Sequence, residues 1–540
     1  MSGLRTLLVG VDAACGEVLD PLLADGDLPA LGSLAGGGAS GPLESQLPPW
    51  TPSAWPSLYT GTNPGKHGSF GFLEYDGYDW DVVDATTVRA PTLWELLDEQ
   101  GRSSVVVNGP VTAPPPPIDG AVVPGFTAPE DPPCHPPGLL EDLRGELGEY
   151  RVYGDSEFAD ADRERRREEY RDLVASRGGA FRYLADRFDP EFGFLQFQQS
   201  DTAVHDFPGD RELLAAVYRA IDDEIAATID ACDPDAVIVA SDHGIGPYDG
   251  YEFRANEFLR ERGYLETTRE GRGRPSWVPI WQEKLTDDED GGRLDRLLSS
   301  GPAERALSLA ADAVGRAGLA SVARTVVPDR LLTATSVGEH VDFPASRAYL
   351  RLPVELGVRI NLAGREPDGV VPRDRYEAVR EELIEALAAV RTPDGDPVFD
   401  RVVPREAVLE GPFIDRAPDV MLVPAGFEQF PSARVGTDQF GPPDEPWNHK
   451  REGFIAVAGE GVDTSGGEVL GDAHLLDVAP TVLATLGVPV SDRMDGRVLP
   501  VADHPGTERY PPPGHVRNGT TGDAGSDTTM HRRLEDLGYL

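Results

Sequence analysis

Val237-Ile-Val-Ala-Ser-Asp-His-Gly244 is the stretch that decides the fold class and indicates a functional site. It begins with an apolar run typical of a strand buried in a sheet, and it ends in Asp242 and His243, whose side chains bind metal ions well. In open α/β sheets, ligands bind at the carboxyl ends of the parallel strands. The stretch therefore predicts a buried strand with metal-binding side chains at that edge.

Other segments carry groups that could join this pair. Each has an ordinary explanation when taken alone, because an aspartate after a strand is more often a turn or helix-capping residue than a ligand. The further candidates are Asp12 after the apolar run 7–11, Thr51 in the proline-rich segment 48–56, Asp201 and His205 after the apolar run 192–197, and His449 before the apolar run 454–459. With Asp242 and His243 they supply three carboxylates, three imidazoles and one hydroxyl, which predicts one shared site.

The order of these groups resembles that of the alkaline phosphatase superfamily, specifically its type I phosphodiesterase/nucleotide pyrophosphatase branch. The spacing from Thr51 to Thr60-Gly61 matches that between the nucleophilic threonine and the Thr-Gly pair of the branch, and the ending Pro64-x-x-His67-Gly68 matches as well. Residues 357–367 and 475–487 are similar to segments of its predicted phosphohydrolase/phosphomutase group. The resemblance spans nearly all of the chain before its final segment.

The alternation of apolar strands and helical patterns in the first half of the chain favours a parallel sheet covered by helices, as the resemblance also implies. We expect an alkaline-phosphatase-like α/β fold, with a mostly parallel sheet sandwiched by helices and a helical insertion or cap. Its catalytic core would be discontinuous, formed by residues 1–250 and 346–502. Residues 251–345 would form the insertion, with a helical segment at 295–327, and residues 503–540 a disordered tail. Other helices are expected at 17–34, 93–100, 163–188, 211–232, 373–390 and 477–486.

The resemblance implies two divalent metal ions, expected to be zinc, with manganese or iron as alternatives. One ion would be held by Asp12, Thr51, Asp242 and His243, and the other by Asp201, His205 and His449. Two cations about 4 Å apart can clamp both the attacking and the leaving oxygen of an in-line displacement. Thr51 would be the nucleophile. Its attack would give a phosphothreonine intermediate and, after hydrolysis, overall retention at phosphorus.

The sequence departs from the family at two places. Ala13 follows Asp12 where the family commonly has glycine, and residues 69–74 lack the asparagine that the nucleotide pyrophosphatases use to stabilise the oxyanion. Asn63 or a backbone N–H would have to replace that asparagine. These departures favour general phosphohydrolase chemistry over nucleotide pyrophosphatase activity. Three residues are candidates for binding the substrate anion, namely Asn63, Arg359 and Arg451.

The composition is strongly acidic, with 93 Asp and Glu against 49 Lys and Arg and a formal net charge of −44. The acidic residues are spread along the chain, and Lys66, Lys284 and Lys450 are the only lysines. Salt screens such self-repulsion, so the composition favours a protein of a halophilic cytoplasm. The alternative is an acidic surface for a basic partner. Nucleic-acid binding is not expected, because it needs basic patches.

The three cysteines, Cys15, Cys134 and Cys232, are too few and too scattered for a disulfide framework. The first residues lead directly into a strand without the apolar core of a signal peptide, and no stretch approaches 18 apolar residues. The sequence therefore predicts a soluble, cytoplasmic protein.

Taken together, the sequence predicts a metal-dependent phosphohydrolase that cleaves small phosphate esters through Thr51, and it favours diesters over monoesters as substrates. One alternative is a phosphomutase of the same superfamily, which returns the phosphoryl group to the product. Another is an inactive relative that only binds anions. A sulfatase is disfavoured, since Thr51 stands where sulfatases have a cysteine convertible to formylglycine. The sequence does not indicate the oligomeric state.

Overall fold

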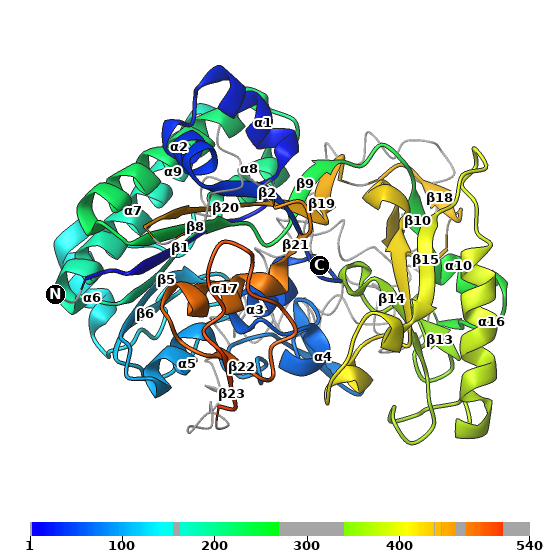
Figure 1. The fold of residues 1–540 in the computed structure, drawn as a ribbon. Coiled ribbons are helices and arrows are strands. Elements are labelled where there is room, and N and C mark those ends of the chain that lie inside the picture. The colour runs from blue at the N-terminus through cyan, green and yellow to red at the C-terminus, as the bar shows by residue number, and fades with distance from the viewer. Residues whose placement is uncertain are drawn as a thin grey trace, which may run out of the picture.

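A computed structural model describes residues 3–154, 163–268, 340–436, 438–443, 445–460, 462 and 470–510. These residues form two lobes (Figure 1). The larger lobe is built on a twisted sheet with helices on both faces, and the smaller lobe is built mainly from residues between 252 and 441. Of the functional candidates, Asp12, Thr51, Asp201 and Asp242 lie on or shortly after elements of the larger lobe, whereas Arg359 lies on a strand of the smaller lobe.

The sheet of the larger lobe has eight strands in the order β21-β2-β20-β8-β1-β7-β5-β6. Five neighbouring strands are parallel, whereas β20 runs antiparallel to both β8 and β2. Their bounds are β1 Thr6–Val11, β2 Ala39–Glu44, β5 Ser104–Gly109, β6 Gly120–Pro124, β7 Phe192–Phe197, β8 Ala236–Ala240, β20 Glu452–Gly459 and β21 Ala473–His474. The expected α/β fold with a mostly parallel sheet sandwiched by helices is thus confirmed.

The central strands are buried on both faces, which explains why they are continuous apolar runs. Within β1, Leu7 and Val9 pack on one face while Leu8 packs on the other, as the alternation of side chains in a strand requires. The helices on the face of Leu7 are α1 Gly16–Asp25, α2 Pro29–Gly37, α6 Leu139–Leu147, α7 Arg163–Phe188, α8 Gln199–Asp206 and α9 Arg211–Cys232. The helices on the face of Leu8 are α3 Thr51–Thr60, α5 Leu93–Glu99 and α17 Val478–Thr485.

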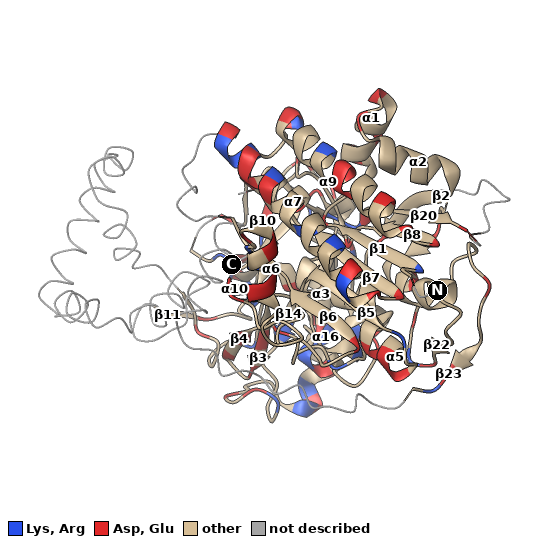
Figure 2. Cartoon of the chain, turned by 90° about the vertical axis from the view of Figure 1, so that its left-hand side faces the viewer, with Lys and Arg blue, Asp and Glu red and all other residues tan. Residues whose placement is uncertain are grey.

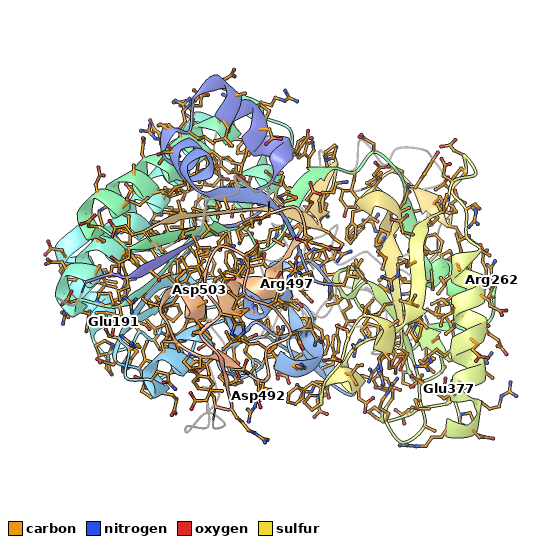
Figure 3. The ribbon with its side chains drawn as sticks, viewed as in Figure 1. Glu191, Arg262, Glu377, Asp492, Arg497 and Asp503 are labelled. Carbon is orange, nitrogen blue, oxygen red and sulfur yellow. The ribbon has the colours of Figure 1, made fainter. Side chains whose placement is uncertain are left out.

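The smaller lobe has its own core, formed around a four-stranded antiparallel sheet in the order β13-β14-β16-β15. A three-stranded sheet, β17-β10-β18, packs beside it. The bounds are β10 Glu252–Arg254, α10 Ala255–Glu261, β13 Ala348–Tyr349, β14 Gly357–Ile360, α16 Tyr376–Ala388, β15 Phe399–Pro404, β16 Val420–Pro424, β17 Phe430–Ser432 and β18 Phe440–Gly441. Charged side chains such as Arg262 and Glu377 lie at the outer edge of this lobe (Figure 3).

Short elements join the two lobes. The strands β9 and β19 form an antiparallel ribbon between them, and β3 and β4 form an antiparallel hairpin. The bounds of these strands and of one further short helix are α4 Pro64–His67, β3 Leu73–Asp76, β4 Asp79–Val82, β9 Gly244–Pro247 and β19 Trp447–Lys450. Four further short strands are β11 Thr267–Thr268, β12 His340–Val341, β22 Val490–Ser491 and β23 Thr507–Glu508.

The expected division of the chain remains a proposal. Within 346–502, the strands up to β18 belong to the smaller lobe, and β20, β21 and α17 return to the larger sheet. The helix expected at 295–327 and most of the tail lie outside the described residues.

Across the described part, no helix combines the length and apolar character needed to cross a membrane. Acidic and basic residues are interspersed along α7 and α9 (Figure 2).

Candidate metal centre and active site

Asp12 follows β1 at the carboxyl end of the strand and is completely buried. Its Oδ2 accepts hydrogen bonds from Trp55 Nε1 and from Gln196 Nε2, both at 3.0 Å. Asn108 Nδ2 donates to Gln196 Oε1 at 2.6 Å, which fixes the orientation of the glutamine amide. Oδ1 has no hydrogen-bond donor among the described residues and lies 3.4 Å from His243 Nε2. One oxygen of Asp12 is therefore saturated by the protein and the other is left for a cation.

Ala13 continues the turn after Asp12 with a φ of 59°, in the left-handed region. This conformation is sterically unfavourable for a residue with a Cβ atom, whereas glycine adopts it readily. The conformation thus gives a physical reason for the glycine that the family commonly has at this position, and the turn forms here in spite of the alanine.

Asp242 and His243 follow β8 and are both completely buried. His243 Nε2 lies 3.4 Å from Asp242 Oδ2. On the other side of the ring, Nδ1 lies 3.0 Å from the carbonyl oxygen of Gly244, a contact that requires the proton on Nδ1. Nε2 then presents its lone pair to the carboxylates. Metal-binding histidines are commonly oriented in this way by a backbone carbonyl.

Thr51 is the first residue of α3 and is only 1% exposed. Its Oγ1 lies 3.5 Å from His243 Nε2, so the hydroxyl points at the same cluster. The amino end of a helix carries a partial positive charge and favours a bound anion. Thr51 therefore combines a hydroxyl, a position beside the candidate ligands and an electrostatic environment suited to a phosphoryl group.

A second group of candidates lies beside the first. Asp201 and His205 are one turn apart on α8, and His205 Nε2 lies 3.5 Å from Asp201 Oδ1. His449 lies on β19, opposite Ile245 of β9, and its Nε2 is 3.6 Å from Asp201 Oδ1 and 3.3 Å from His205 Nε2. The ribbon of β9 and β19 thus brings a late histidine to the end of β8.

The proton positions of these two histidines suit metal binding as well. His449 Nδ1 lies 3.0 Å from the carbonyl oxygen of Pro49, and its ring stacks on that of His243 with centroids 3.7 Å apart. His205 Nδ1 lies 3.6 Å from Glu445 Oε2. In both side chains an acceptor faces Nδ1, so that Nε2 faces Asp201.

The candidate ligands form two overlapping groups. Ligand atoms of Asp12, Asp242 and His243 lie within 4.8 Å of one another, and so do those of Asp201, His243 and His449. His243 belongs to both groups, whereas the family resemblance predicts that it binds one ion only. His205 lies next to the second group through its contacts with Asp201 and His449.

The electrostatics of the cluster indicate missing positive charge. Burial, then the neighbouring carboxylates Asp242 and Asp201, raises the pKa of Asp12 well above its usual range. Burial likewise raises the pKa of Asp242 to about 6, although His243 opposes the shift. Both oxygens of Asp242 lack a hydrogen-bond donor within the described part of the chain. Buried carboxylates without donors are costly unless a cation compensates them, so this donor set fits divalent metal ions.

Asp201 and the histidines beside it behave differently. Burial would raise the pKa of Asp201, but His205, His449 and His243 outweigh it and hold the pKa below its usual range. For His205, burial lowers the pKa, whereas Asp201 and Glu445 raise it to about 10 overall. Burial and the neighbouring His243 keep the pKa of His449 well below its usual range. Without a metal ion, the cationic His205 compensates Asp201, and a bound dication would take over that role.

The structure does not bring the three candidate anion-binding residues to the cluster. Asn63 caps α4, with its Oδ1 accepting from Gly65 N and its Nδ2 donating to Asp495. Arg359 is paired with Glu366 in the smaller lobe. Arg451 forms an ion pair with Glu44 at 2.6 Å and donates to the carbonyl of Ser45. Each of the three has a structural partner where it lies.

Four residues around the cluster were missed by the sequence analysis: Trp50, which stacks on His449, Trp55 and Gln196, which donate to Asp12, and Glu445, which faces His205. Two of them leave a signal in the sequence. Trp55 lies four residues after Thr51, on the same face of α3. Gln196 is a polar residue inside the apolar run of β7.

Comparison with known proteins agrees with the fold. The chain matches the family model for type I phosphodiesterase / nucleotide pyrophosphatase over residues 6–310, more than half of its length. No curated protein sequence matches it.

Solved structures are similar to the chain at low sequence identity. Phosphonoacetate hydrolase from Sinorhizobium meliloti 1021 in complex with phosphonoformate has a TM-score of 0.54 and 17% identity, covering 90% of this chain and 96% of that chain. Its complex with phosphonoacetate has a TM-score of 0.53 at the same identity and coverage. Human ectonucleotide pyrophosphatase / phosphodiesterase 5 has a TM-score of 0.47 and 13% identity, with the same coverage. At this low sequence identity, the structural similarity between this chain and phosphonoacetate hydrolase shows a shared fold.

Proposed function

The chain belongs to the type I phosphodiesterase/nucleotide pyrophosphatase family, and from this premise we propose that it hydrolyses small phosphate esters, diesters in preference to monoesters, with Thr51 as the nucleophile. One observation carries the proposal. The buried hydroxyl of Thr51 lies 3.5 Å from His243 Nε2, in a cluster where Oδ1 of Asp12 and both carboxylate oxygens of Asp242 lack a hydrogen-bond donor within the described residues. Such a cluster has little structural use without a cation.

We propose two divalent ions, most suitably zinc, because the donors are a mixture of imidazole nitrogens and carboxylate oxygens. Asp12, Thr51, Asp242 and His243 would hold one ion, and Asp201, His205 and His449 the other. When bound, the ions would lower the pKa of the threonine hydroxyl and neutralise charge on the phosphoryl oxygens.

The residues of the chain have distinct parts in the reaction. Thr51 Oγ1 attacks phosphorus, a P–O bond to threonine forms, and the P–O bond to the alcohol leaving group breaks on the opposite side. Water then attacks the phosphothreonine, which releases the phosphorylated product and restores the hydroxyl. The amino end of α3 holds the phosphoryl oxygens through its partial positive charge. Trp55 and Gln196 keep Asp12 in place throughout.

The test compares wild type with Thr51→Ala and Thr51→Ser in molar salt with zinc or manganese. Substrates are bis-p-nitrophenyl phosphate, p-nitrophenyl phosphate and, because of the fold shared with phosphonoacetate hydrolase, phosphonoacetate. We expect diester turnover to fall by about 10³-fold or more in Thr51→Ala and to persist in part in Thr51→Ser, since only serine keeps a hydroxyl. Equal melting temperatures would show that both variants fold.

The outcomes separate the alternatives. Undiminished turnover in Thr51→Ala would exclude Thr51 as nucleophile. A preference for the monoester would indicate a phosphatase, and a preference for phosphonoacetate a phosphonate hydrolase. Transfer of the phosphoryl group within a sugar phosphate, with little free phosphate, would indicate a phosphomutase. Two bound metal equivalents without turnover of these esters would favour the phosphomutase or a narrow substrate specificity, whereas a protein without bound metal and without turnover would be a relative that only binds anions.

A further inference from the structure

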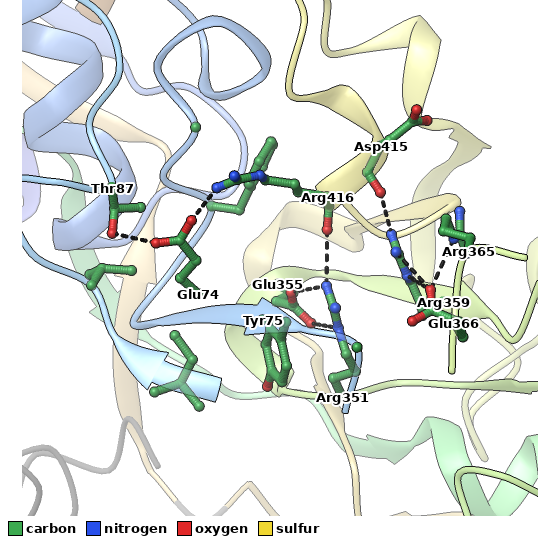
Figure 4. A pocket seen from close by; sticks show the side chains of 15 residues that line it. Glu74, Tyr75, Thr87, Arg351, Glu355, Arg359, Arg365, Glu366, Asp415 and Arg416 are labelled. Carbon is green, nitrogen blue, oxygen red and sulfur yellow. Dashed lines mark hydrogen bonds and ion pairs between the residues drawn. The ribbon is translucent and has the colours of Figure 1, made fainter. Parts of the chain in front are cut away.

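Two cavities away from the metal centre are lined by basic residues. They differ in how far neighbouring carboxylates neutralise the positive charges of those residues. The first, of about 210 Å³, lies between the β3 hairpin and the smaller lobe (Figure 4). Its lining contains four arginines and four acidic residues, namely Arg351, Arg359, Arg365 and Arg416 and Glu74, Glu355, Glu366 and Asp415. Ion pairs such as Arg351 with Glu355 already neutralise the charges of the arginines. This cavity is therefore part of the packing between the hairpin and the smaller lobe.

The second cavity, of about 460 Å³, has an unbalanced lining. It lies where the carboxyl end of α3 meets the segments 89–96, 412–413 and 491–494. Lys66, Arg89 and Arg493 line it, and no carboxylate does. The chain has 93 acidic and 49 basic residues. A cavity lined by three basic residues and no acidic one is therefore unusual for this chain.

The rest of the lining is mostly apolar. It consists of the hydroxyl residues Thr60, Thr62 and Ser491 and the apolar residues Ala90, Pro91, Leu96, Pro412, Phe413 and Met494. Ligand sites for small molecules typically have volumes of about 300–1,000 Å³, apolar walls and a few polar groups that fix orientation. The size and chemistry of this cavity agree with that description.

The cations are available to a ligand to different degrees. Lys66 Nζ is paired with Asp495 and lies 3.2 Å from Glu410, and it donates to the carbonyl of Arg493 at 3.3 Å. Its position is therefore fixed. Arg89 lies 3.5 Å from Glu74, a long contact for an ion pair. Among the described residues, no carboxylate lies within ion-pair distance of Arg493.

The cavity is separate from the metal centre. Thr51 begins α3 and Thr60 ends it. Nine steps along a helix correspond to about 14 Å, so a ligand in the cavity would lie beyond the reach of the catalytic groups.

We propose that this cavity binds a small organic anion in which an apolar or aromatic body carries one phosphate, phosphonate or carboxylate group. The anionic group pairs with Arg493 and Arg89, with Lys66 behind them, and the body packs between Phe413, Met494 and Pro91. Both parts contribute, because exposed charge pairs alone are weak in water and the apolar walls offer surface to bury.

The test is calorimetric titration of the metal-loaded protein with phenylphosphonate, benzoate, inorganic phosphate and benzyl alcohol. Variants are Arg493→Glu and Arg89→Glu. The matched control is Arg497→Glu, which makes the same charge change on the same segment at a residue that is 60% exposed and outside the cavity (Figure 3). All three arginines have exposed side chains, and equal melting temperatures would show that the variants fold.

We expect phenylphosphonate and benzoate to bind at least about tenfold more tightly than inorganic phosphate or benzyl alcohol. Arg493→Glu and Arg89→Glu would each weaken them by about tenfold or more, and Arg497→Glu would leave them unchanged. The same site would persist in Asp242→Asn, which alters only the metal centre. Absence of binding, binding insensitive to Arg493→Glu and Arg89→Glu, or equal affinity for inorganic phosphate would each overturn the proposal.

Discussion

Asp242 is the residue whose surroundings depend most directly on a cation. It is completely buried, and both of its oxygens lack a donor within the described residues. Burial raises its pKa to about 6. When the pKa of an acid is higher in the folded state than in the unfolded state, the folded protein binds the proton more tightly. The free energy of unfolding therefore falls as the pH rises and the proton is lost. In the metal-free protein, Asp242 therefore destabilises the fold as the pH rises from about 4 to 7.

The variant Asp242→Asn removes this charge and keeps the shape of the side chain. After treatment with a chelator, the variant is expected to melt above wild type, and the difference in the free energy of unfolding to grow by on the order of 2 kcal/mol between pH 4 and 7. With zinc present the order reverses, because wild type gains the binding energy of the ion. Melting curves in chelator and in zinc check both signs. A variant that melts below wild type in both conditions would show that Asp242 stabilises the fold without a metal ion.

The sequence could indicate the seven clustered candidates because each follows a strand, begins a helix or lies on a short ribbon at the same sheet edge. Asn63 shows where this reasoning stops. It precedes a proline at the start of α4, and asparagine before proline is a common helix-capping pattern. Arg359 and Arg451 have partners from distant segments, Asp415 and Ser45 among them, which no local pattern reveals.

At the scale of elements, α3 is held against β1 by a close contact at Gly10. A Cβ added to Gly10 would lie 2.4 Å from the Trp55 ring and 3.1 Å from Gln196. Both of these side chains donate to Asp12 Oδ2. Glycine is therefore needed at position 10 for Trp55 and Gln196 to reach Asp12.

Gly10→Ala is expected to cost about 1–3 kcal/mol in the free energy of unfolding, as overpacking in a core does. Because it displaces donors to a candidate ligand, it would also weaken metal binding by about 10- to 100-fold. Denaturation and metal titration measure the two effects. Gly36→Ala on α2 is the control, since nothing lies within 4 Å of a Cβ there. Unchanged metal affinity in Gly10→Ala would show that Trp55 and Gln196 do not position Asp12.

Sequence periodicity predicted most helices closely, and its failures have physical causes. The helices expected at 163–188 and 211–232 are observed with those bounds. The helix expected at 17–34 is two helices, α1 and α2, because the chain turns at Gly26 with a φ of 77° and restarts at Pro29. The pattern could not assign strands to sheets, because β16 of the smaller lobe is as apolar as β1 and β8 of the larger lobe.

For the whole molecule, the net charge of −44 predicts a strong dependence on salt. Self-repulsion of a like-charged surface destabilises the compact state, and the Debye length falls from about 10 Å at 0.1 M salt to about 3 Å at 1 M. We propose on this basis that the protein is adapted to high salt.

The melting temperature is expected to rise steeply with KCl below about 1 M and more slowly above it, because screening is then nearly complete. Thermal unfolding from 0.1 to 3 M KCl measures this. Isosmolar sucrose is the control, because it strengthens burial by exclusion from the surface without screening charge. A melting temperature that is insensitive to KCl, or that rises equally in sucrose, would contradict adaptation through charge.

The whole molecule also assembles the active site, since residues between 12 and 449 must meet at one sheet edge to form it. The proposed reaction consists of two successive displacements at phosphorus, the first by Thr51 and the second by water. The most direct measurement is therefore the stereochemical course of hydrolysis of a diester made chiral at phosphorus with sulfur and oxygen isotopes. Two inversions predict overall retention of configuration. Overall inversion would mean that water attacks the substrate directly, and Thr51 would then not be the nucleophile.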